Sequence, residues 1–481
     1  MSIPSINDRS DAVAFLDDRS GRGIKPGLDR IGGLLDYMAN PHLAFPIIHV
    51  AGTNGKTTVT RLASDILGAH GLRVGTFISP HLHRVEDRFL LSGLPFDEQA
   101  FTDAVRDIAW FVEEYETRSG HGVTYFELTA ALAFSAFADA AVDVAVIEVG
   151  LGGRLDATNV VDAAVSVLTG VAMDHMSYLG DSITQIAGEK AAILKDGGRL
   201  VTGPLPPTAD GPITAAVADT GSRWFRFGDD FRVSTAIQAV GGWSVDLEGI
   251  YASYSDLYLP LHGRHQVDNL ATAAAAVEVF LEGPLDEDAL RTATTTATSP
   301  GRLEVADRHP LILLDGAHNE EGFHGLATTL TDEFPPQRWN LVVGMRGERV
   351  PQDLLRPLQG LVGAVWATEP DDEAAIAAAD VAAAAAEVLD VPVETMPAVS
   401  DAVDAAIAAA GAEGAVVVAG SLYVVGEARS DLVGEAVRPA AVHVRYEAPI
   451  GDADLAIEDA DLAIEDADLM DLDEDERWDG E

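Results

Sequence analysis

The feature that most constrains the fold of this chain is a glycine-rich turn between an aliphatic run and an amphipathic pattern, in HVAGTNGKTTV at residues 49–59. The apolar residues of 46–51 predict a buried strand. After the turn, apolar residues recur at helical spacing, at Val59, Leu62, Ala63, Ile66 and Leu67. Strand, glycine turn and helix in this order indicate half of a βαβ unit, in which backbone N–H groups at the helix N-terminus can face a bound phosphate.

The same rhythm continues along the chain. VDVAVIEVG (142–150) and AAVSVLTGV (163–171) predict further strands, and LTAALAFSAFADA before them predicts a helix. Alternating strands and helices indicate a mostly parallel sheet covered by helices, with the ligand site at the carboxyl ends of the strands. A second α/β series begins near Pro300 and includes PLILLDGAHN, RWNLVVGM, GAVWAT and GAVVVAGSLYVVGEAR.

These patterns predict an α/β protein with three regions. Residues 1–297 are expected to form an N-terminal domain with a phosphate-binding loop, and residues 298–445 a smaller, Rossmann-like α/β domain. Residues 446–481 repeat ADLAIED and carry almost only acidic charge. That composition is typical of a disordered, solvating tail.

Charge and composition exclude several function classes. The chain has 78 acidic residues against 31 Lys and Arg, a net charge of -47, which argues against binding nucleic acid through its phosphates. It has no cysteine, so disulfides, thiolate metal sites and cysteine nucleophiles are excluded. The sequence shows neither a signal-peptide pattern nor an apolar membrane span, and we expect a cytoplasmic protein that does not bind membranes.

The surface charge also singles out the lysines. A surface this acidic resembles that of salt-adapted proteins, in which concentrated salt screens the self-repulsion. Nearly all cationic residues are arginines, and the whole chain has only four lysines, at Lys25, Lys56, Lys190 and Lys195. Each lysine is therefore a candidate for a specific role.

The loop departs from the common Walker pattern, which requires a glycine at the position of Val50. It matches a shorter form, GTNGKTT at 52–58, with the same mechanics. Lys56 would neutralise the outer phosphates, and a threonine hydroxyl would reach Mg²⁺. The alternative is a glycine-rich turn with a solvated lysine. The flanking strand and helix, and the presence of a scarce lysine at the required position, favour nucleotide binding.

Polar side chains stand at further strand ends. Glu148 interrupts an apolar strand before the glycine-rich turn of VIEVGLGGRLDATN, and His175 follows another strand in GVAMDHMSYLG. EKAAILK places Lys190 and Lys195 on a predicted helix. Each residue alone has a structural interpretation, because a buried polar group needs only hydrogen bonds or an opposite charge. Together, a carboxylate and an imidazole near the phosphate loop predict a site for a second Mg²⁺.

In these motifs and others along its length, the chain resembles folylpolyglutamate synthase and the bifunctional dihydrofolate synthase, members of the Mur-ligase-like superfamily of ATP-dependent amide-forming enzymes. The resemblance covers roughly residues 20–430, with the motifs in the family's order. The matching stretches are GTNGKTT, SPHLHRVEDRF (79–89), TYFELTAALAF (124–134), EVGLGGRLDATN (148–159), DHMSYLG (174–180), EKAAILK (189–195), GRHQVDNLATA (263–273), PGRLE (300–304) and LDGAHNEEG (314–322).

The resemblance implies a role for each matching position. The residues that would hold ATP are Thr53, Asn54, Gly55, Lys56, Thr57, Thr58, Asn269, Arg302 and Asp315. The implied metal ligands are Thr58, Ser79, Glu148 and His175. The pterin-bearing substrate would meet Thr124, Tyr125, Phe126, Arg154, Leu155 and Asp156, with a weaker match around Gly27. The implied catalytic residues are Lys56, His318 close to the phosphates, and Lys190 at a position that family members carbamylate.

The implied reaction is ATP-dependent addition of L-glutamate to the γ-carboxylate of folates, and to dihydropteroate, through an acyl phosphate. ATP and two Mg²⁺ ions are the implied cofactors, K⁺ is a further candidate, and we expect a monomer acting on small molecules. The family usually has glycine after the loop lysine, where this chain has Thr57, as in the Mur ligases that build peptidoglycan precursors. A Mur-type ligase of UDP-muramoyl peptides is therefore one alternative, and a non-catalytic nucleotide-binding regulator is another.

Overall fold

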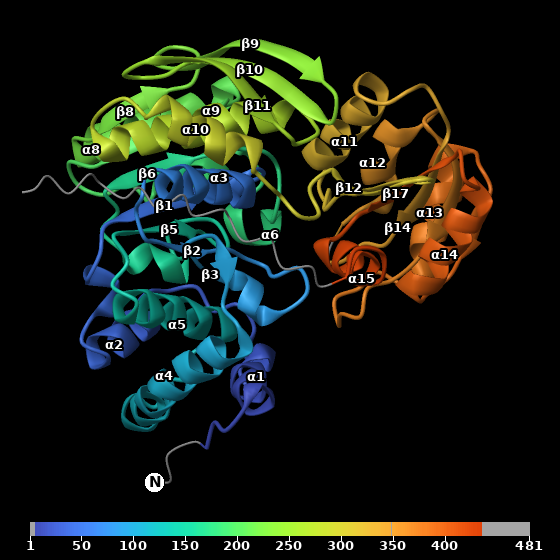
Figure 1. Cartoon of the computed structure of the whole chain (residues 1–481). Helices are drawn as coiled ribbons and strands as arrows, with labels where there is room; N and C mark the ends of the chain where they lie inside the picture. Colours follow the sequence, from blue (N-terminus) through green and yellow to red (C-terminus); the bar gives the residue numbers. More distant parts are fainter. Residues whose placement is uncertain (1–4, 348, 435–481) are drawn as a thin grey trace, which may run out of the picture. The chain divides into compact units, whose positions relative to one another are not determined.

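The computed structural model describes residues 5–347 and 349–434. The predicted tail at 446–481 lies outside the described residues. Within that described part, no helix combines the length and apolar character needed to cross a membrane. The described residues build three β-sheets with helices packed on them, and Figure 1 shows the helices and strands in chain order.

The first sheet has eight strands in the order β4-β3-β2-β5-β1-β6-β7-β8. The pairs from β2 to β8 are parallel, and β3 and β4 add an antiparallel edge. The strands are β1 (Ile47–Ala51), β2 (Val74–Phe77), β3 (Phe89–Leu91), β4 (Leu94–Pro95), β5 (Val144–Glu148), β6 (Val165–Leu168), β7 (Arg199–Thr202) and β8 (Arg223–Arg226). The predicted strands around residues 46–51, 142–150 and 163–171 are confirmed as β1, β5 and β6.

Both faces of this sheet are buried, because successive side chains alternate between two cores. In β5, Val144 and Val146 belong to one apolar cluster, and Ala145 and Ile147 belong to the other. A strand covered on both faces reads as a continuous apolar run, which explains why the aliphatic stretches were recognisable in the sequence. The carboxyl ends of β1, β5 and β6 therefore emerge side by side from a rigid support.

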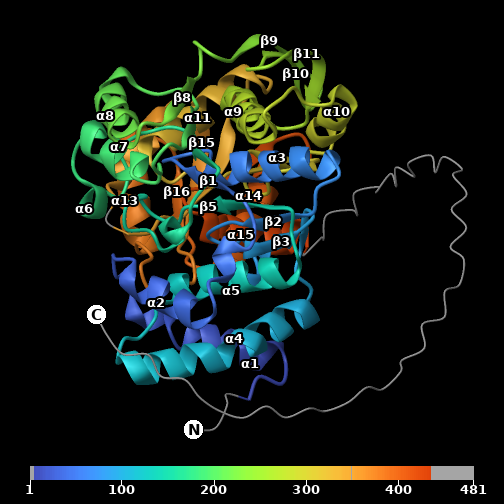
Figure 2. The ribbon, with the colours of Figure 1, turned by 90° about the vertical axis from the view of Figure 1, so that its left-hand side faces the viewer.

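Helices cover the two faces of the sheet. One face carries α3, α9 and α10, and the other carries α1, α2, α4 and α5, as Figures 1 and 2 show from two directions. The helices up to residue 295 are α1 (Arg9–Asp17), α2 (Asp29–Tyr37), α3 (Lys56–Ala69), α4 (Glu98–Ser119), α5 (Tyr125–Asp139), α6 (Met176–Leu179), α7 (Ile183–Ala191), α8 (Asp210–Thr220), α9 (Arg264–Leu281) and α10 (Glu287–Thr295). The predicted helix in LTAALAFSAFADA is confirmed as part of α5.

One helix prediction was partly wrong. Lys190 lies on α7, which ends at Ala191, so Lys195 lies beyond the helix. Lys195 Nζ donates to the backbone and side-chain oxygens of Asn159, both at 2.9 Å, and Asn159 lies in the short 3-10 helix Ala157–Val160. Lys195 therefore has a structural use, away from Lys190.

The sequence analysis missed the second sheet, an antiparallel meander of β9 (Arg232–Ala239), β10 (Gly242–Glu248) and β11 (Ser253–Leu259). Only one face of this sheet is buried, and Val245 and Leu257 pack there against the helix layer of α9 and α10. Ile237 stays 62% exposed on β9. The strands carry many polar residues and are interrupted by register shifts, so no apolar run marks them in the sequence.

The third sheet has six strands in the order β12-β13-β17-β14-β15-β16, all parallel except the β12–β13 pair. Its strands are β12 (Glu304–Arg308), β13 (Leu311–Leu314), β14 (Trp339–Val343), β15 (Val362–Ala367), β16 (Val393–Thr395) and β17 (Ala415–Ala419). Its helices are α11 (Glu320–Asp332), α12 (Pro351–Leu355), α13 (Ala378–Leu389), α14 (Val399–Ala410) and α15 (Leu422–Leu432).

This sheet confirms the second α/β series. The stretch GAVVVAGSLYVVGEAR contains both β17 and the beginning of α15, whose N-cap is Ser421. The described chain is thus an α/β protein with mostly parallel sheets, as predicted. The predicted boundary at residue 297 falls between the second and third sheets, and the division into two domains stays a proposal.

Candidate active site

The loop between β1 and α3 has a backbone shape that only glycine allows at two positions. Gly55, the N-cap of α3, has φ +82°, and a Cβ on Gly52 would lie 1.9 Å from Thr169 Oγ1. The end of β6 holds this shape, because Thr169 Oγ1 donates to Asn54 O at 2.6 Å and Thr53 N donates to Gly170 O at 2.9 Å. The loop therefore presents the N-terminus of α3 as an anion site.

Two of the four lysines converge on one carbonyl of this loop. Lys56 Nζ donates to Gly52 O at 3.1 Å and to Thr53 O at 3.0 Å, and Lys190 Nζ donates to Gly52 O at 2.7 Å. Burial lowers the pKa of Lys56, and burial together with the charge of Lys56 lowers the pKa of Lys190 to about 7. Positive charge is thus concentrated at the loop of an otherwise acidic chain.

Glu148 lies at the end of β5 beside this loop, and its side chain is buried. Thr57 Oγ1 donates to Glu148 Oε1 at 2.9 Å, and Ser79 N donates to Oε2 at 3.2 Å. Burial raises the pKa of Glu148, while the charge of Lys56 opposes that shift. A buried carboxylate with the Thr57 hydroxyl beside it offers oxygen ligands of the kind that Mg²⁺ requires.

The other two predicted metal ligands are placed differently. Thr58 Oγ1 is buried and pairs with Ser299 Oγ at 2.9 Å, so the hydroxyl that reaches Glu148 belongs to Thr57. His175 adopts φ +48° and is half exposed, and burial of its ring lowers its pKa to about 4. A neutral imidazole is the form that ligates a metal.

The described residues contain no group of three or more His, Asp or Glu side chains that could hold a metal ion alone. Glu148 is instead accompanied by Thr57, Ser79 and, across the loop, Lys56. These residues fit a Mg²⁺ ion that keeps several waters and takes further oxygens from nucleotide phosphates. The site therefore fits a metal that arrives with its nucleotide.

Predicted nucleotide ligands from further along the chain also reach the loop. Asn269 on α9 lies against Gly55, because a Cβ on that glycine would be 2.5 Å from Asn269 Oδ1. Asn269 Nδ2 donates to Gln266 Oε1 at 2.9 Å, which fixes the amide. The structure thus brings Asn269 together with the loop.

Three predicted residues stand on the segments before β12 and after β13. Asp315 is buried and accepts from Leu303 N and Ala317 N, both at 2.9 Å, and burial raises its pKa. Arg302 Nη1 donates to Gly316 O at 3.3 Å, and His318 Nδ1 lies 2.8 Å from the same oxygen. Gly316 O therefore orients the guanidinium and the imidazole together.

The predicted substrate residues at the start of α5 mostly make contacts within the protein. Thr124 is the N-cap of α5 and forms a capping box with Glu127, at 2.7 and 3.2 Å. The ring of Phe126 fills the space above Gly150, where a Cβ would lie 2.4 Å from its Cζ. Tyr125 is overlaid by the Arg88 guanidinium at 5.4 Å from the ring centre.

The turn after β5 separates its predicted residues into two kinds. Asp156 is buried and accepts three hydrogen bonds, from Leu151 N at 2.8 Å, Thr158 N at 3.0 Å and Thr158 Oγ1 at 2.5 Å. Arg154 is half exposed and pairs with Glu189 at 3.0 Å, and Leu155 is 48% exposed. Only the last two are accessible from outside the turn.

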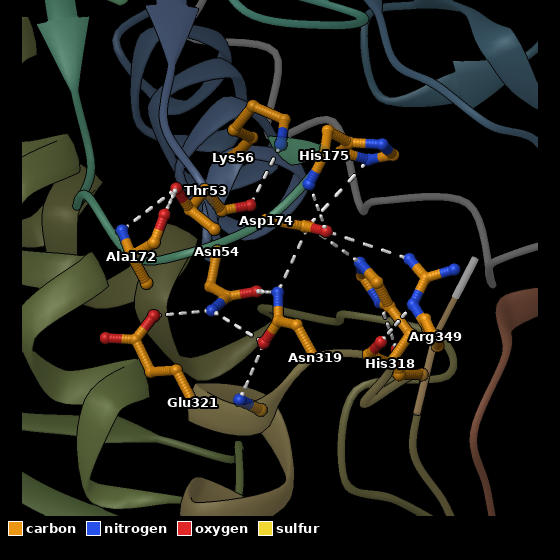
Figure 3. Close-up of polar contacts among 12 residues, drawn as sticks. Thr53, Asn54, Lys56, Ala172, Asp174, His175, His318, Asn319, Glu321 and Arg349 are labelled. Atoms are coloured by element: carbon orange, nitrogen blue, oxygen red, sulfur yellow. Dashed lines mark hydrogen bonds and ion pairs between the residues drawn. The ribbon is translucent and has the colours of Figure 1, made fainter. Parts of the chain in front are cut away.

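The sequence analysis missed three residues that join this site. Asp174 Oδ2 accepts from Asn319 Nδ2 at 3.2 Å and lies 3.5 Å from His318 Nε2, while Arg349 Nη2 lies 3.8 Å from Asp174 Oδ1. Figure 3 shows Asp174 at the centre of these contacts. Asp174 precedes His175 and Asn319 follows His318 in the quoted motifs, and that adjacency was the available signal.

Comparison with known proteins places this geometry in context. Residues 50–277 match the family described as the Mur ligase middle domain, and residues 301–422 match the family described as the Mur ligase, glutamate ligase domain. A dihydrofolate synthase/folylpolyglutamate synthase of Mycobacterium tuberculosis is 38% identical over 381 residues, which are 76% of this chain and 78% of that protein.

Two further relatives extend the comparison. A probable bifunctional folylpolyglutamate synthase/dihydropteroate synthase of Halobacterium salinarum is 36% identical over 435 residues, 87% of this chain and 51% of that protein. The solved structure of Mycobacterium tuberculosis folylpolyglutamate synthase complexed with ADP is 36% identical, with a TM-score of 0.84, and covers 88% of this chain and 98% of that one. The similarity to a protein of a salt-loving organism agrees with the acidic surface.

Proposed function

Because the chain belongs to the folylpolyglutamate and dihydrofolate synthase family of Mur-ligase-like enzymes, we propose that it joins L-glutamate to folates at the expense of ATP. The observation that carries the proposal is the pair of lysines on Gly52 O, buried Lys190 and partly buried Lys56, beside the buried carboxylate of Glu148. This arrangement combines a phosphate-binding cation with an oxygen-rich metal position.

ATP is bound by the loop and by groups from the later part of the chain. The N-terminus of α3, together with Thr53, Asn54 and Gly55, holds the phosphates, and Lys56 offsets their charge. The remaining nucleotide contacts are assigned to Thr57, Thr58, Asn269, Arg302 and Asp315. Asn269 is the best supported of these, since it already touches Gly55.

Mg²⁺ is the metal that the oxygen ligands favour. Glu148, Ser79 and Thr57 would hold one ion beside the phosphates, and Thr58 and His175 remain proposed ligands that would have to turn toward it. Bound there, Mg²⁺ would offset the negative charge of the phosphoryl group during transfer. A second Mg²⁺ and a K⁺ ion are further proposed cofactors.

Lys190 is proposed to carry a carbamate. An amine adds to CO₂ only when neutral, and a pKa of about 7 leaves a large neutral fraction at physiological pH. The neutral amine forms an N–C bond to CO₂ and releases one proton to give an anionic carbamate; counted from the ammonium, two protons are released and the charge changes from +1 to −1. That group would add a carboxylate-like ligand beside the loop, in exchange for the hydrogen bond to Gly52 O.

The proposed reaction has two steps. The substrate's γ-carboxylate oxygen attacks the γ-phosphorus of ATP, giving an acyl phosphate and ADP. The amine of glutamate then attacks the acyl carbon, expels inorganic phosphate and loses a proton. Lys56 is assigned to balance charge on the transferred phosphoryl group, and His318, oriented by Gly316 O, is assigned to contact the phosphate. No residue of the chain has to form a covalent bond with the substrate.

The acceptor is proposed to be dihydropteroate as well as folate. Arg154 and Leu155 are accessible for substrate contact, and Asp156 holds the turn on which they stand. Thr124 fixes the start of α5 through its capping box. Tyr125 and Phe126 would provide aromatic surface for the pterin. The enzyme is proposed to act as a monomer on these small molecules.

An ADP-release assay in concentrated KCl tests the function. ATP, Mg²⁺ and glutamate are supplied with dihydropteroate, tetrahydrofolate or a UDP-muramoyl peptide as the acceptor. We expect release with the first two acceptors and none without glutamate. Release only with the muramoyl peptide would identify a Mur-type ligase, and ATP binding without turnover on any acceptor would identify a regulator.

A further inference from the structure

Asn319 uses every hydrogen-bonding position of its side-chain amide. As the N-cap of α11, its Oδ1 accepts from Gly322 N at 2.8 Å, and the same oxygen accepts from Asn54 Nδ2 at 3.3 Å. Its Nδ2 donates to Asn54 Oδ1 at 3.1 Å and to Asp174 Oδ2 at 3.2 Å. An amide offers two donors and two acceptor lone pairs, so this buried side chain is fully satisfied.

Asn54 lies in the loop between β1 and α3, residues 52–55, which is called the nucleotide loop below. Asn54 immediately precedes Gly55, and its amide pairs reciprocally with that of Asn319, as Figure 3 shows. Asn54 Nδ2 also donates to Glu321 Oε2 at 2.5 Å, in the first turn of α11. A displacement of the loop backbone would therefore strain or break the hydrogen bonds that join the loop to the start of α11.

Asp174 provides the second attachment. Its Oδ1 accepts from His175 N at 2.9 Å, and its Oδ2 accepts from Asn319 and lies near His318. The segment after β6 and the segment after β13 thus meet at one carboxylate.

The other end of α11 is fixed independently. Glu333, the C-cap of α11, accepts from Gly263 N at 2.8 Å and lies 3.1 Å from His262 Nδ1. Its carbonyl accepts from Gln238 Nε2 at 3.1 Å. With one end held at the nucleotide loop and the other at the start of α9, α11 has little freedom to shift along its axis.

We propose that Asn319 is a positioning residue that docks the turn carrying His318 onto the nucleotide loop. It acts through Asn54 and Asp174, and it sets the distance between the phosphates on the loop and the groups of the later turn. The inference rests on the proposed function for its kinetic consequence, while the docking itself is independent of the reaction. The expected effect falls on turnover, since misplaced reacting groups slow the chemical step more than they weaken nucleotide binding.

The variant Asn319→Asp separates docking from helix capping. Aspartate is as good an N-cap as asparagine, so α11 keeps its cap, but both donated hydrogen bonds are lost and a charge is placed beside Asp174 and Glu321. We expect kcat for folate-dependent ADP release to fall about 10- to 100-fold, with the KM for ATP within about threefold. Asp97→Asn at the N-cap of α4 makes the reverse exchange at an exposed position and should leave kcat unchanged.

A partner exchange and a distance measurement complete the test. In Asp174→Asn/Asn319→Asp the donor and the acceptor trade places, and we expect kcat to recover at least threefold over Asn319→Asp alone. The natural chain has no cysteine, so dyes on Ala215→Cys and Ala412→Cys report the distance between α8 and the β17 side of the third sheet. With AMPPCP bound, Asn319→Asp should broaden that distance distribution.

Unchanged kcat and an unchanged distance distribution in Asn319→Asp would overturn the docking role. Lack of recovery in the double variant would overturn the part played by Asp174. If the unaltered chain released no ADP with any folate acceptor, the proposed function would fail, and the dye distances would still decide whether Asn319 docks the turn. Thermal unfolding of each variant verifies that α11 remains folded.

Discussion

The nucleotide loop and the turn at Gly150–Asp156 are both glycine-rich segments that follow a buried strand, yet they use their polar side chains in opposite ways. In the loop, Lys56 and Lys190 both donate to Gly52 O, so two cationic side chains meet at one carbonyl. In the turn, Asp156 accepts three hydrogen bonds from its own segment. A residue of a motif can thus take part in the reaction or hold the backbone in place, and its hydrogen bonds distinguish the two roles.

Lys56→Ala should give the largest effect and mark the loop as the chemical region. Removing the cation at the phosphates should lower glutamate-dependent ADP release by about a thousandfold or more, while circular dichroism and unfolding stay native. Lys25→Ala, at an exposed lysine, is the matched control and should retain activity. Normal turnover in Lys56→Ala would remove the loop from the mechanism.

Asp156→Ala should instead act through stability. Two backbone N–H groups and the Thr158 hydroxyl lose a buried acceptor, which should lower the free energy of unfolding by about 1–3 kcal/mol. Denaturant titration measures that loss, and Lys56→Ala serves as the comparison. If Asp156→Ala were as stable as the native chain and lost only acceptor binding, the contrast between the two regions would be wrong.

The charge of Lys190, at the loop, is expected to depend on pH. Burial lowers its pKa to about 7, so the ammonium dominates below that pH and the neutral amine dominates above it. Carbamate formation should therefore rise about tenfold from pH 6 to pH 8, following the neutral fraction. The ¹³C resonance of a carbamate in ¹³C-bicarbonate measures it, with Lys190→Ala as the blank. A signal that persists in that variant belongs to another amine.

The same pKa has a consequence for stability. An unfolded lysine binds its proton up to about pH 10.4, whereas folded Lys190 loses it near pH 7. Between these values the unfolded chain binds more protons at this site, so the contribution of Lys190 to the free energy of unfolding rises with pH.

Arg154→Ala should have the smallest effect on the fold. Its ion pair with Glu189 is exposed and screened by salt, so the change in unfolding free energy should stay below about 0.5 kcal/mol. If Arg154 contacts the acceptor, the KM for dihydropteroate should rise about three- to tenfold with little change in the KM for ATP. An unchanged KM for every acceptor would leave Arg154 as a surface residue.

The sequence predicted those parts of the fold that have a clear pattern of apolar residues or glycines. Strands buried on both faces, such as β1 and β5, appear as aliphatic runs, and the glycines of the loop mark the turn between strand and helix. The meander of β9 to β11 has one exposed face and irregular register, and nothing in its composition distinguished it from a loop. The exact end of α7 was missed because the apolar pattern continues through Ile193 and Leu194 into the following turn.

The candidate site was predictable where motifs follow neighbouring strands of one sheet. Thr57 meets Glu148 because α3 begins just after β1, and Glu148 ends β5, which pairs with β1. The contact between Asn54 and Asn319 joins residues 265 positions apart, and no local pattern predicts which side chains meet across such a separation. The use of Asp156 as an internal acceptor depends on the backbone of its turn, which single-residue chemistry does not determine.

The transfer of oxygen from the substrate carboxylate to phosphate tests most directly whether the reaction passes through an acyl phosphate. Folate with ¹⁸O in its γ-carboxylate is turned over with ATP, Mg²⁺ and glutamate in concentrated KCl, and the inorganic phosphate released is examined by mass spectrometry. If the carboxylate is activated as an acyl phosphate, each turnover places one ¹⁸O in phosphate. Product formation with no ¹⁸O in phosphate would show that the γ-phosphoryl group is never transferred to the substrate, and would contradict the proposed acyl-phosphate intermediate.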